Sequence, residues 1–375
     1  MDTNADRPDG FSARLNQRLI DKALGQTQKT IVCSEGGIMD QTTSHALETP
    51  YVQAIEHESA GRQVIASGSP PLLSVTGLTV ALADRPETRL LDAVQFELRK
   101  GEFFALVGES GSGKSVLCST LMGVASSELR CLGDIHIDGR PLADVDRRQR
   151  AMIYQQPSLY LNPVRTIGFQ LRETVQMVGL SMRDASQRAA DLLCDVGIDD
   201  PRETMRKYPH EMSGGMNQRV MIAMALAMKP KLLIADEPTS ALDVTTQKQI
   251  LDLLERLRSD MAILFVTHDL GVAVQRSDRI GVLYAGQLVE LGRANLVART
   301  PLHPYTRALF SSVPPLSEHP RRLHSSSGSL PEPGQRQAGC SFASRCSGTL
   351  DICRRTRPAL QGIPQQVVAC HNLEA

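Results

Sequence analysis

The chain has 375 residues, 41% hydrophobic and 22% charged, and its 41 lysines and arginines balance 41 aspartates and glutamates. The length suggests two or three domains, and the balanced charge argues against a dedicated nucleic-acid-binding protein, which is usually basic. The longest apolar runs, such as Met221–Met228 and Ala262–Val266, are far shorter than the roughly 20 residues that span a bilayer. Residues 1–25 contain acids and a proline but no apolar stretch, so they do not resemble a secretory signal, and we expect a soluble, cytosolic protein.

The chain divides into three parts by composition. Residues 1–70 have no clear helical or strand period, which predicts a poorly ordered N-terminal extension. Residues 71–310 have the apolar strand and helix patterns of a folded domain. Residues 311–375 begin with a Ser-, Pro- and Gly-rich linker and end in a cysteine-rich segment.

Short strands and helices alternate along the middle part. Continuous apolar runs of strand length indicate strands that are buried on both faces, while other runs alternate like half-buried strands. Helical patterns lie between them, so the sequence predicts an α/β domain with a largely parallel sheet. The expected strands are Leu72–Val75, Leu78–Val80, Val94–Leu98, Phe103–Val107, Leu232–Ala235 and Ala262–Val266, and the expected helices are Ser115–Met122, Ala189–Val196, Val220–Met228 and Val244–Arg258.

A glycine-rich loop follows the strand Phe103–Val107 and precedes a predicted helix. It fits the pattern G-x-x-x-x-G-K-[ST], in which glycines let the backbone wrap a phosphate chain and the helix N-terminus favours an anion. Lys114 is then expected to hold the β- and γ-phosphates, and Ser115 to bind Mg²⁺. The predicted ATP-binding residues are Gly108, Glu109, Ser110, Gly111, Ser112, Gly113, Lys114, Ser115 and Val116.

A second glycine motif, Ser213-Gly214-Gly215-Met216, precedes the apolar helix. Ser-Gly-Gly at a helix start is able to bind an anion. On its own, however, it fits a simple N-cap followed by core residues equally well.

Two acids, Asp236 and Glu237, end the strand Leu232–Ala235. A strand that delivers a carboxylate to the sheet edge would place Asp236 beside the Mg²⁺ held by Ser115. Glu237 would then orient and deprotonate the attacking water. Paired acids after a strand are also common as loop residues, so this interpretation depends on the phosphate loop.

The order of these motifs resembles that of the ATP-binding cassette (ABC) ATPases, over about residues 72–310. In this resemblance Gln155 corresponds to the Q-loop glutamine and joins Ser115 and Asp236 around Mg²⁺, Asp243 ends the D-loop, and His268 is the switch histidine, catalytic together with Glu237 and Gln155. The family has a mixed-sheet core with a helical subdomain, here about residues 164–212. Two cassettes close over two ATP molecules, so the resemblance implies that Ser213–Met216 contact ATP in the partner cassette.

The chain departs from the family in one respect. Its cassettes usually stack adenine on an aromatic residue near the first strands, but there is none between Leu72 and Gln95. Nucleotide affinity is therefore expected to depend more on the phosphates.

Local strings resemble those of oligopeptide and dipeptide importer ATPases. They include Leu161-Asn162-Pro163 after the Q-loop and His303–Leu309 beyond the cassette. The resemblance implies an ATPase that powers import of di- or oligopeptides at the cytoplasmic side of the membrane. Its implied partners are two transmembrane permeases, a second ATPase of the same or another kind and, indirectly, a substrate-binding protein. Nickel or glutathione import and, less in keeping with the single cassette, a non-transport ABC ATPase are the alternatives.

Four of the eight cysteines lie near the C-terminus, and they resemble the four-cysteine tail of the same importers. Four thiolates at these spacings are able to bind a [4Fe–4S] cluster or Zn²⁺, or they are free thiols. The absence of short C-x₂₋₄-C pairs favours iron–sulfur, and nearby arginines are expected to offset thiolate charge. The cysteines are Cys340, Cys346, Cys353 and Cys370, and the arginines are Arg345, Arg354, Arg355 and Arg357.

Overall fold

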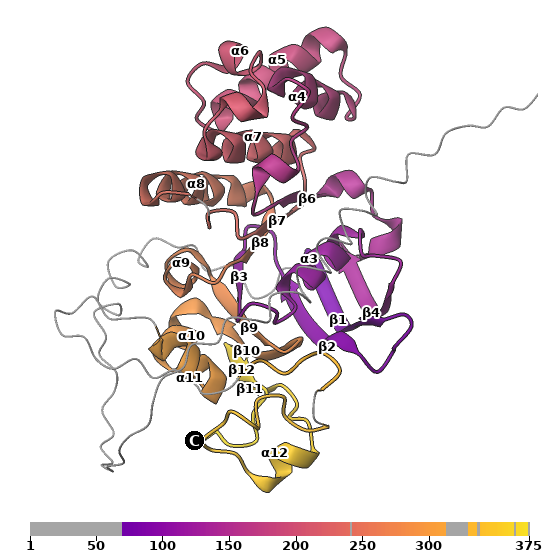
Figure 1. Cartoon of the computed structure of the whole chain (residues 1–375), viewed down its shortest axis with the longest axis vertical. Coiled ribbons are helices and arrows are strands. Elements are labelled where there is room, and N and C mark those ends of the chain that lie inside the picture. Colours follow the sequence, from indigo (N-terminus) through magenta and orange to yellow (C-terminus); the bar gives the residue numbers. More distant parts are fainter. Residues whose placement is uncertain (1–69, 241, 313–328, 336–337, 364, 374–375) are drawn as a thin grey trace, which may run out of the picture.

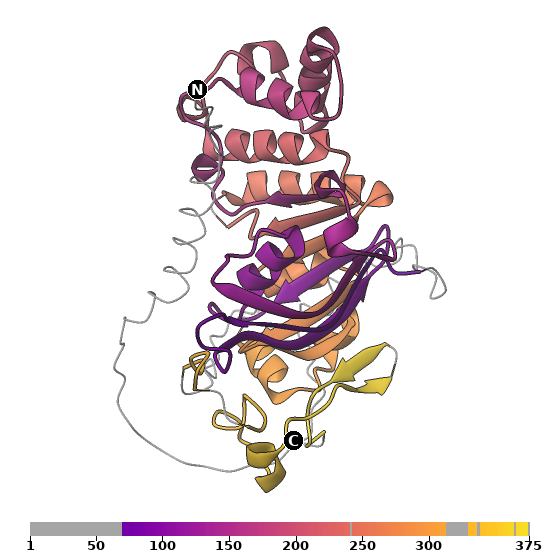
Figure 2. The same cartoon turned by 90° about the vertical axis from the view of Figure 1, so that its right-hand side faces the viewer.

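The computed structural model describes residues 70–240, 242–312, 329–335, 338–363 and 365–373. The predicted N-terminal extension, apart from Pro70, lies outside the described residues, as does much of the predicted linker. Two sheets form the centre of the molecule, with helices on both sides of the larger one and a group of helices at one end (Figures 1 and 2). The predicted α/β cassette is thereby confirmed.

The larger sheet has the strand order β11-β12-β10-β9-β3-β8-β7-β6. Its neighbours from β9 through β3, β8 and β7 to β6 run parallel. β10 pairs antiparallel with β9 and β12, and β11 pairs antiparallel with β12. The strands are β3 (Phe103–Val107), β6 (Arg150–Ile153), β7 (Leu232–Asp236), β8 (Ala262–Val266), β9 (Arg279–Tyr284), β10 (Gln287–Arg293), β11 (Gln361–Ile363) and β12 (Gln366–Val368).

The smaller sheet is antiparallel, with the order β2-β1-β4-β5. Its strands are β1 (Leu73–Leu82), β2 (Arg89–Leu98), β4 (Leu129–Ile137) and β5 (Arg140–Pro141). The two short strands predicted at Leu72–Val75 and Leu78–Val80 form one strand, β1. Its register with both neighbours shifts near Gly77, which has φ 61°, so a bulge and not a turn separates the two apolar runs.

Ten helices are described. The strands β3 and β8 are completely buried beneath them, because both are apolar on both faces. The predicted helix at Ala189–Val196 is the second half of α5, whose polar first half begins after the N-cap Ser181. The helices are α3 (Lys114–Met122), α4 (Ile167–Gln176), α5 (Met182–Asp195), α6 (Pro201–Thr204), α7 (Gly214–Ala227), α8 (Val244–Leu257), α9 (Leu270–Arg276), α10 (Ala294–Arg299), α11 (Pro304–Ser311) and α12 (Asp351–Arg355).

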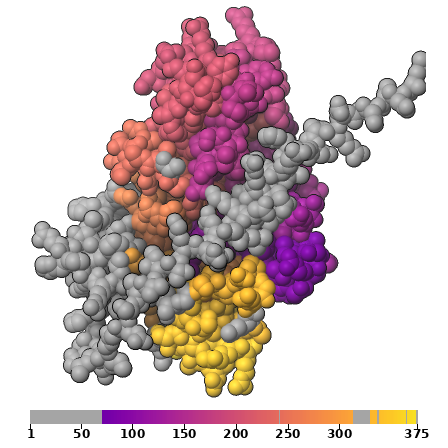
Figure 3. Space-filling view, in the orientation of Figure 1, coloured from indigo at the N-terminus to yellow at the C-terminus, as the bar shows by residue number. Residues whose placement is uncertain are grey.

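The cysteine-rich segment packs on the cassette. Its strands β11 and β12 extend the larger sheet, and Phe342 packs against Tyr284 and Tyr305. The segment (yellow) lies beside the strands of the smaller sheet in the space-filling view (Figure 3). Among the described helices, none has the length and hydropathy needed to cross a membrane.

Candidate functional site

The phosphate-loop motif lies between β3 and α3, as its sequence predicts. Gly108 has φ 157°, and a Cβ atom there would lie 2.2 Å from the carbonyl oxygen of Leu283, so a side chain does not fit. Gly113 is the N-cap of α3, with φ 107°, and a Cβ there would lie 2.8 Å from Leu91 Cδ2. The backbone is therefore packed closely at both glycines, which is why neither position has room for a side chain.

Lys114 is buried at the start of α3. Its Nζ donates hydrogen bonds to the carbonyl oxygens of Gly108 (2.8 Å) and Glu109 (3.0 Å). Burial lowers the pKa of Lys114, while the nearby Glu237 and Asp236 raise it. Ser112 Oγ is buried and has no hydrogen-bond partner among the described residues. A buried cation and an unpaired hydroxyl beside a glycine-rich turn fit a bound polyphosphate.

Parallel strand order brings the other predicted residues to the same sheet edge. β6, β7, β8 and β3 all end there, and Gln155, Asp236 and His268 lie at or just beyond three of these strand ends. Burial is the main reason that the pKa of Asp236 is raised, although a hydrogen bond from Ser115 and the charge of Lys114 lower it. A divalent cation held by Ser115 and Asp236 would offset this cost, so the oxygen donors fit Mg²⁺.

Glu237 lies between two other predicted catalytic residues. Its Oε2 accepts a hydrogen bond from Gln155 Nε2 at 2.9 Å, and its Oε1 lies 3.3 Å from His268 Nδ1. The backbone of Glu237 has φ 47°, in the left-handed region that costs a non-glycine residue about 1–2 kcal/mol. The strained backbone is therefore that of Glu237, whose carboxylate contacts both Gln155 and His268, and such strain is typical of functional sites.

The Ser-Gly-Gly motif begins α7 and lies away from α3 within the same chain (Figure 1). Ser213 Oγ accepts a hydrogen bond from the Met216 amide, which makes it the N-cap. Gly214 has open space where a Cβ would stand, whereas a Cβ at Gly215 would lie 2.7 Å from Thr246. Asp243 likewise caps α8, since its carboxylate accepts hydrogen bonds from Thr246. The role of these residues towards ATP in a partner cassette stays a prediction.

Two residues that the sequence analysis did not assign to the site contact its phosphate loop. Tyr305 Oη accepts a hydrogen bond from the Glu109 amide at 2.9 Å. Arg345 forms two hydrogen bonds, each 3.0 Å long, with the Glu109 carboxylate. They are 196 and 236 residues from Glu109 in the sequence, so no local pattern could have revealed them.

Comparison with known proteins gives two family matches. Residues 91–240 match the ABC transporter model, and residues 289–353 match the model of the oligopeptide/dipeptide transporter C-terminal region. The dipeptide transport ATP-binding protein DppD of Escherichia coli is 42% identical over 302 residues, covering 77% of this chain and 92% of that protein. The oligopeptide transport ATP-binding protein AppD of Bacillus subtilis is 42% identical over 283 residues, covering 72% and 86%.

Solved structures agree with these matches. An ATP-binding subunit of an ABC transporter superposes with a TM-score of 0.53 at 31% identity, covering 61% of this chain and 92% of that one. The cassette MJ0796, solved as a dimer after hydrolysis with ADP and phosphate, gives a TM-score of 0.52 at 27% identity, covering 59% and 98%. The chain therefore belongs to the ABC transporter ATP-binding proteins and carries the C-terminal region typical of the oligopeptide/dipeptide transporters.

Proposed function

We propose that the chain hydrolyses ATP to power the import of di- or oligopeptides, as a peripheral subunit on the cytoplasmic face of the membrane. The observation that carries this proposal is that one chain, on one sheet, combines a nucleotide site with the C-terminal region of peptide transporters. A phosphate loop with its acids lies at one sheet edge, and the C-terminal region typical of peptide transporters is built onto the same sheet. The names of its relatives DppD and AppD support peptides as the cargo.

In this proposal each residue at the sheet edge has a role in hydrolysis. Lys114 binds the β- and γ-phosphates, and Ser115, Asp236 and Gln155 hold Mg²⁺, which when bound neutralises phosphate charge. Glu237 takes a proton from the attacking water, which Gln155 and His268 help to position. Ser213–Met216 and Asp243 serve the second cassette of the pair, which is another copy of this chain or a different ATPase.

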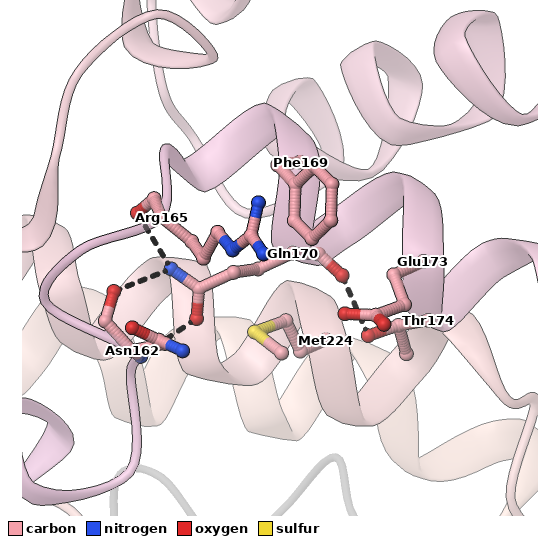
Figure 4. Close-up of a pocket in the computed structure, with 7 residues that line it drawn as sticks. All are labelled: Asn162, Arg165, Phe169, Gln170, Glu173, Thr174 and Met224. Atoms are coloured by element: carbon pink, nitrogen blue, oxygen red, sulfur yellow. Dashed lines mark hydrogen bonds between the residues drawn. The ribbon is translucent and has the colours of Figure 1, made fainter.

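A surface pocket beside the Q-loop is a suitable place for the permease to bind. It has a volume of about 280 Å³. Gln170 Nε2 donates hydrogen bonds to the carbonyl oxygens of Asn162 and Arg165, and the Arg165 guanidinium lies 4.5 Å from the Phe169 ring centroid. Val164, at the rim of this loop, is 76% exposed. The pocket lies between the loop, α4 and α7 (Figure 4), and it is lined by Asn162, Arg165, Phe169, Gln170, Glu173, Thr174 and Met224.

A pull-down from detergent-solubilised native membranes tests the proposal. Tagged wild-type chain is expected to capture two multi-span permeases and a second ATPase, identified by mass spectrometry. Phe169→Asp is expected to lose the permeases because it places a charge in the pocket. Leu132→Asp, at a residue 51% exposed on the other sheet, is the matched control and should keep them. Capture of soluble nucleic-acid partners without membrane proteins would refute the transport function.

Uptake measurements then identify the cargo. Cells lacking this chain are expected to lose uptake of a labelled dipeptide or oligopeptide and to regain it with the wild-type gene. If nickel or glutathione uptake were restored and peptide uptake were not, the alternative importers would be correct.

The [4Fe–4S] cluster predicted for the C-terminal cysteines stays a proposal. The four thiols are free, and each of Cys340 and Cys370 interacts electrostatically with Cys346 and Cys353. Burial raises the pKa of Cys340 to about 11, which favours the protonated thiol. Within the described part of the chain, no three His, Cys, Asp or Glu side chains form a group that would hold a metal ion. As arranged, the thiols form no ready-made site for either a cluster or zinc, so binding of either metal would require them to move closer together, and free thiols are the third alternative.

Anaerobic purification with iron and acid-labile sulfide assays decides between these states. About four irons and four sulfides per chain would be expected of a [4Fe–4S] cluster. Zinc without iron would indicate a structural zinc site, and neither metal, in protein never exposed to oxygen, would leave free thiols.

A further inference from the structure

An arginine of the cysteine-rich segment is held against the phosphate loop. The two terminal nitrogens of Arg345 each donate to a different oxygen of the Glu109 carboxylate, both at 3.0 Å. This two-point contact is the strongest geometry for an arginine and a carboxylate. Glu109 is the second residue of the loop, so a segment more than two hundred residues away contacts the place where ATP is bound.

The contact is largely shielded from water. The Arg345 side chain is 6% exposed and the Glu109 side chain 31%. Its guanidinium lies 5.7 Å from the ring centroids of Tyr284 and Phe342. Burial favours the neutral guanidine, but the hydrogen bonds with Glu109 and Tyr284 raise the pKa of Arg345, which stays charged. A buried pair of this kind costs much to break, because the remaining charge has no compensation.

Glu109 connects Arg345 to Lys114, the residue expected to bind the phosphates. Its amide donates to Tyr305 Oη at 2.9 Å, and its carbonyl oxygen accepts a hydrogen bond from Lys114 Nζ at 3.0 Å. The carboxylate, amide and carbonyl of one loop residue are therefore all engaged. A shift of Arg345 would move the backbone that positions Lys114.

The same segment also contacts the strand behind the other end of the loop. Arg357 donates to Asp92 Oδ2 (2.8 Å) and to the Asp92 carbonyl oxygen (2.7 Å). The neighbouring Leu91 packs against Gly113, the last glycine of the loop. Arg345 and Arg357 were expected to offset thiolate charge. That expectation is wrong for both, since they pair with carboxylates of the cassette.

We propose that Arg345 is a positioning residue for ATP binding, which acts through Glu109 to fix the phosphate loop and Lys114. The nucleotide site is then sensitive to the conformation of the cysteine-rich segment. Arg345 adjoins Cys346, and the Cys340 amide donates to the Cys353 carbonyl oxygen at 2.7 Å, so the thiols and this arginine belong to one packed unit. This inference rests on the ATPase function proposed above.

The test compares full-length variants in MgATP binding, with a fluorescent ATP analogue, and in hydrolysis by the assembled transporter. Arg345→Met is expected to weaken nucleotide binding and to raise the KM for ATP by up to about 10- to 100-fold, because the energy of one charge-assisted contact is the upper limit for a residue that acts through Glu109. We expect kcat at saturating ATP to change less than about threefold, because the groups around Glu237 are untouched. Arg345→Lys keeps the charge but not the two-point contact, so its KM for ATP should lie between those of the wild type and Arg345→Met.

Three controls make the outcome specific. Arg355→Met removes an exposed arginine of the same segment and should bind ATP like the wild type. Glu109→Gln removes the negative charge of the Arg345–Glu109 pair. The double variant Arg345→Met with Glu109→Gln should bind ATP no more weakly than Arg345→Met alone, because both changes remove the same contact. Should Arg345→Met fail to fold, Arg345→Lys carries the test, because Glu109 is itself one of the predicted ATP-binding residues.

The results separate the inference from the function on which it rests. Wild-type protein that fails to bind MgATP would refute the ATPase function. If the folded variants Arg345→Met or Glu109→Gln bind MgATP as tightly as the wild type and have an unchanged KM, only the positioning role is refuted. The same holds if a variant loses kcat and unfolding stability but keeps its KM.

Discussion

Replacing Glu237 with glutamine is expected to leave ATP binding intact and to lower turnover by about 10²–10⁴-fold, the contribution typical of a general base. Glutamine has nearly the same shape, so the contact with Gln155 is able to persist through the remaining carbonyl oxygen. It lacks the basic carboxylate that would take the proton from water. Lys114 and the glycine-rich turn are unchanged, so the grip on the phosphates should survive.

Steady-state hydrolysis and binding of a fluorescent ATP analogue check this expectation together. Glu128→Gln makes the same chemical change at an exposed glutamate and should hydrolyse ATP at the wild-type rate. Turnover of the Glu237→Gln variant within about threefold of the wild type would show that another group is the base.

Replacing Lys114 with alanine is expected to weaken ATP binding by about 10- to 100-fold, since a charged hydrogen bond contributes about 1.5–3 kcal/mol. Lys114 is 7% exposed, and its Nζ contacts only backbone carbonyl oxygens among its hydrogen bonds in the described part of the chain. It is therefore free to exchange these bonds for phosphate oxygens when ATP arrives. The predicted loss is in affinity, in contrast to the loss of turnover expected for Glu237→Gln.

Isothermal titration with MgATP measures the affinity, and thermal unfolding measures whether the fold survives. Lys100→Ala, at an exposed lysine in the turn before β3, is the matched control and should bind as the wild type does. Equal affinity of the Lys114→Ala variant and the wild type would contradict the role given to this lysine.

The phosphate site was accessible from the sequence because its parts are local. The phosphate loop and the two acids directly follow apolar strands, and parallel strands deliver such positions to one edge. Gln155 and His268 were assigned through the resemblance to the ABC ATPases, whereas the position of Glu237 at a strand end could be predicted from its own sequence. The strained backbone of Glu237 could not, because it depends on its surroundings and not on its own sequence.

The C-terminal segment was not accessible in the same way. Four clustered cysteines drew attention to metal binding, and the arginines among them were interpreted accordingly. The partners of Arg345 and Arg357 are Glu109 and Asp92, which are more than two hundred residues away. Contacts at that separation are set by tertiary packing, which periodicity and motif spacing do not encode.

The pairing of β12 with β10 has a consequence for any shortened version of this protein. Cutting the chain after α11 would strip the hydrogen-bonding partner from one side of β10 and would remove Gln366, which donates to the fully buried Glu290. A bare strand edge invites pairing with other chains. A chain shortened in this way would thus be prone to self-association. By covering the edge of β10, the C-terminal segment would keep the protein soluble, in addition to contacting the phosphate loop.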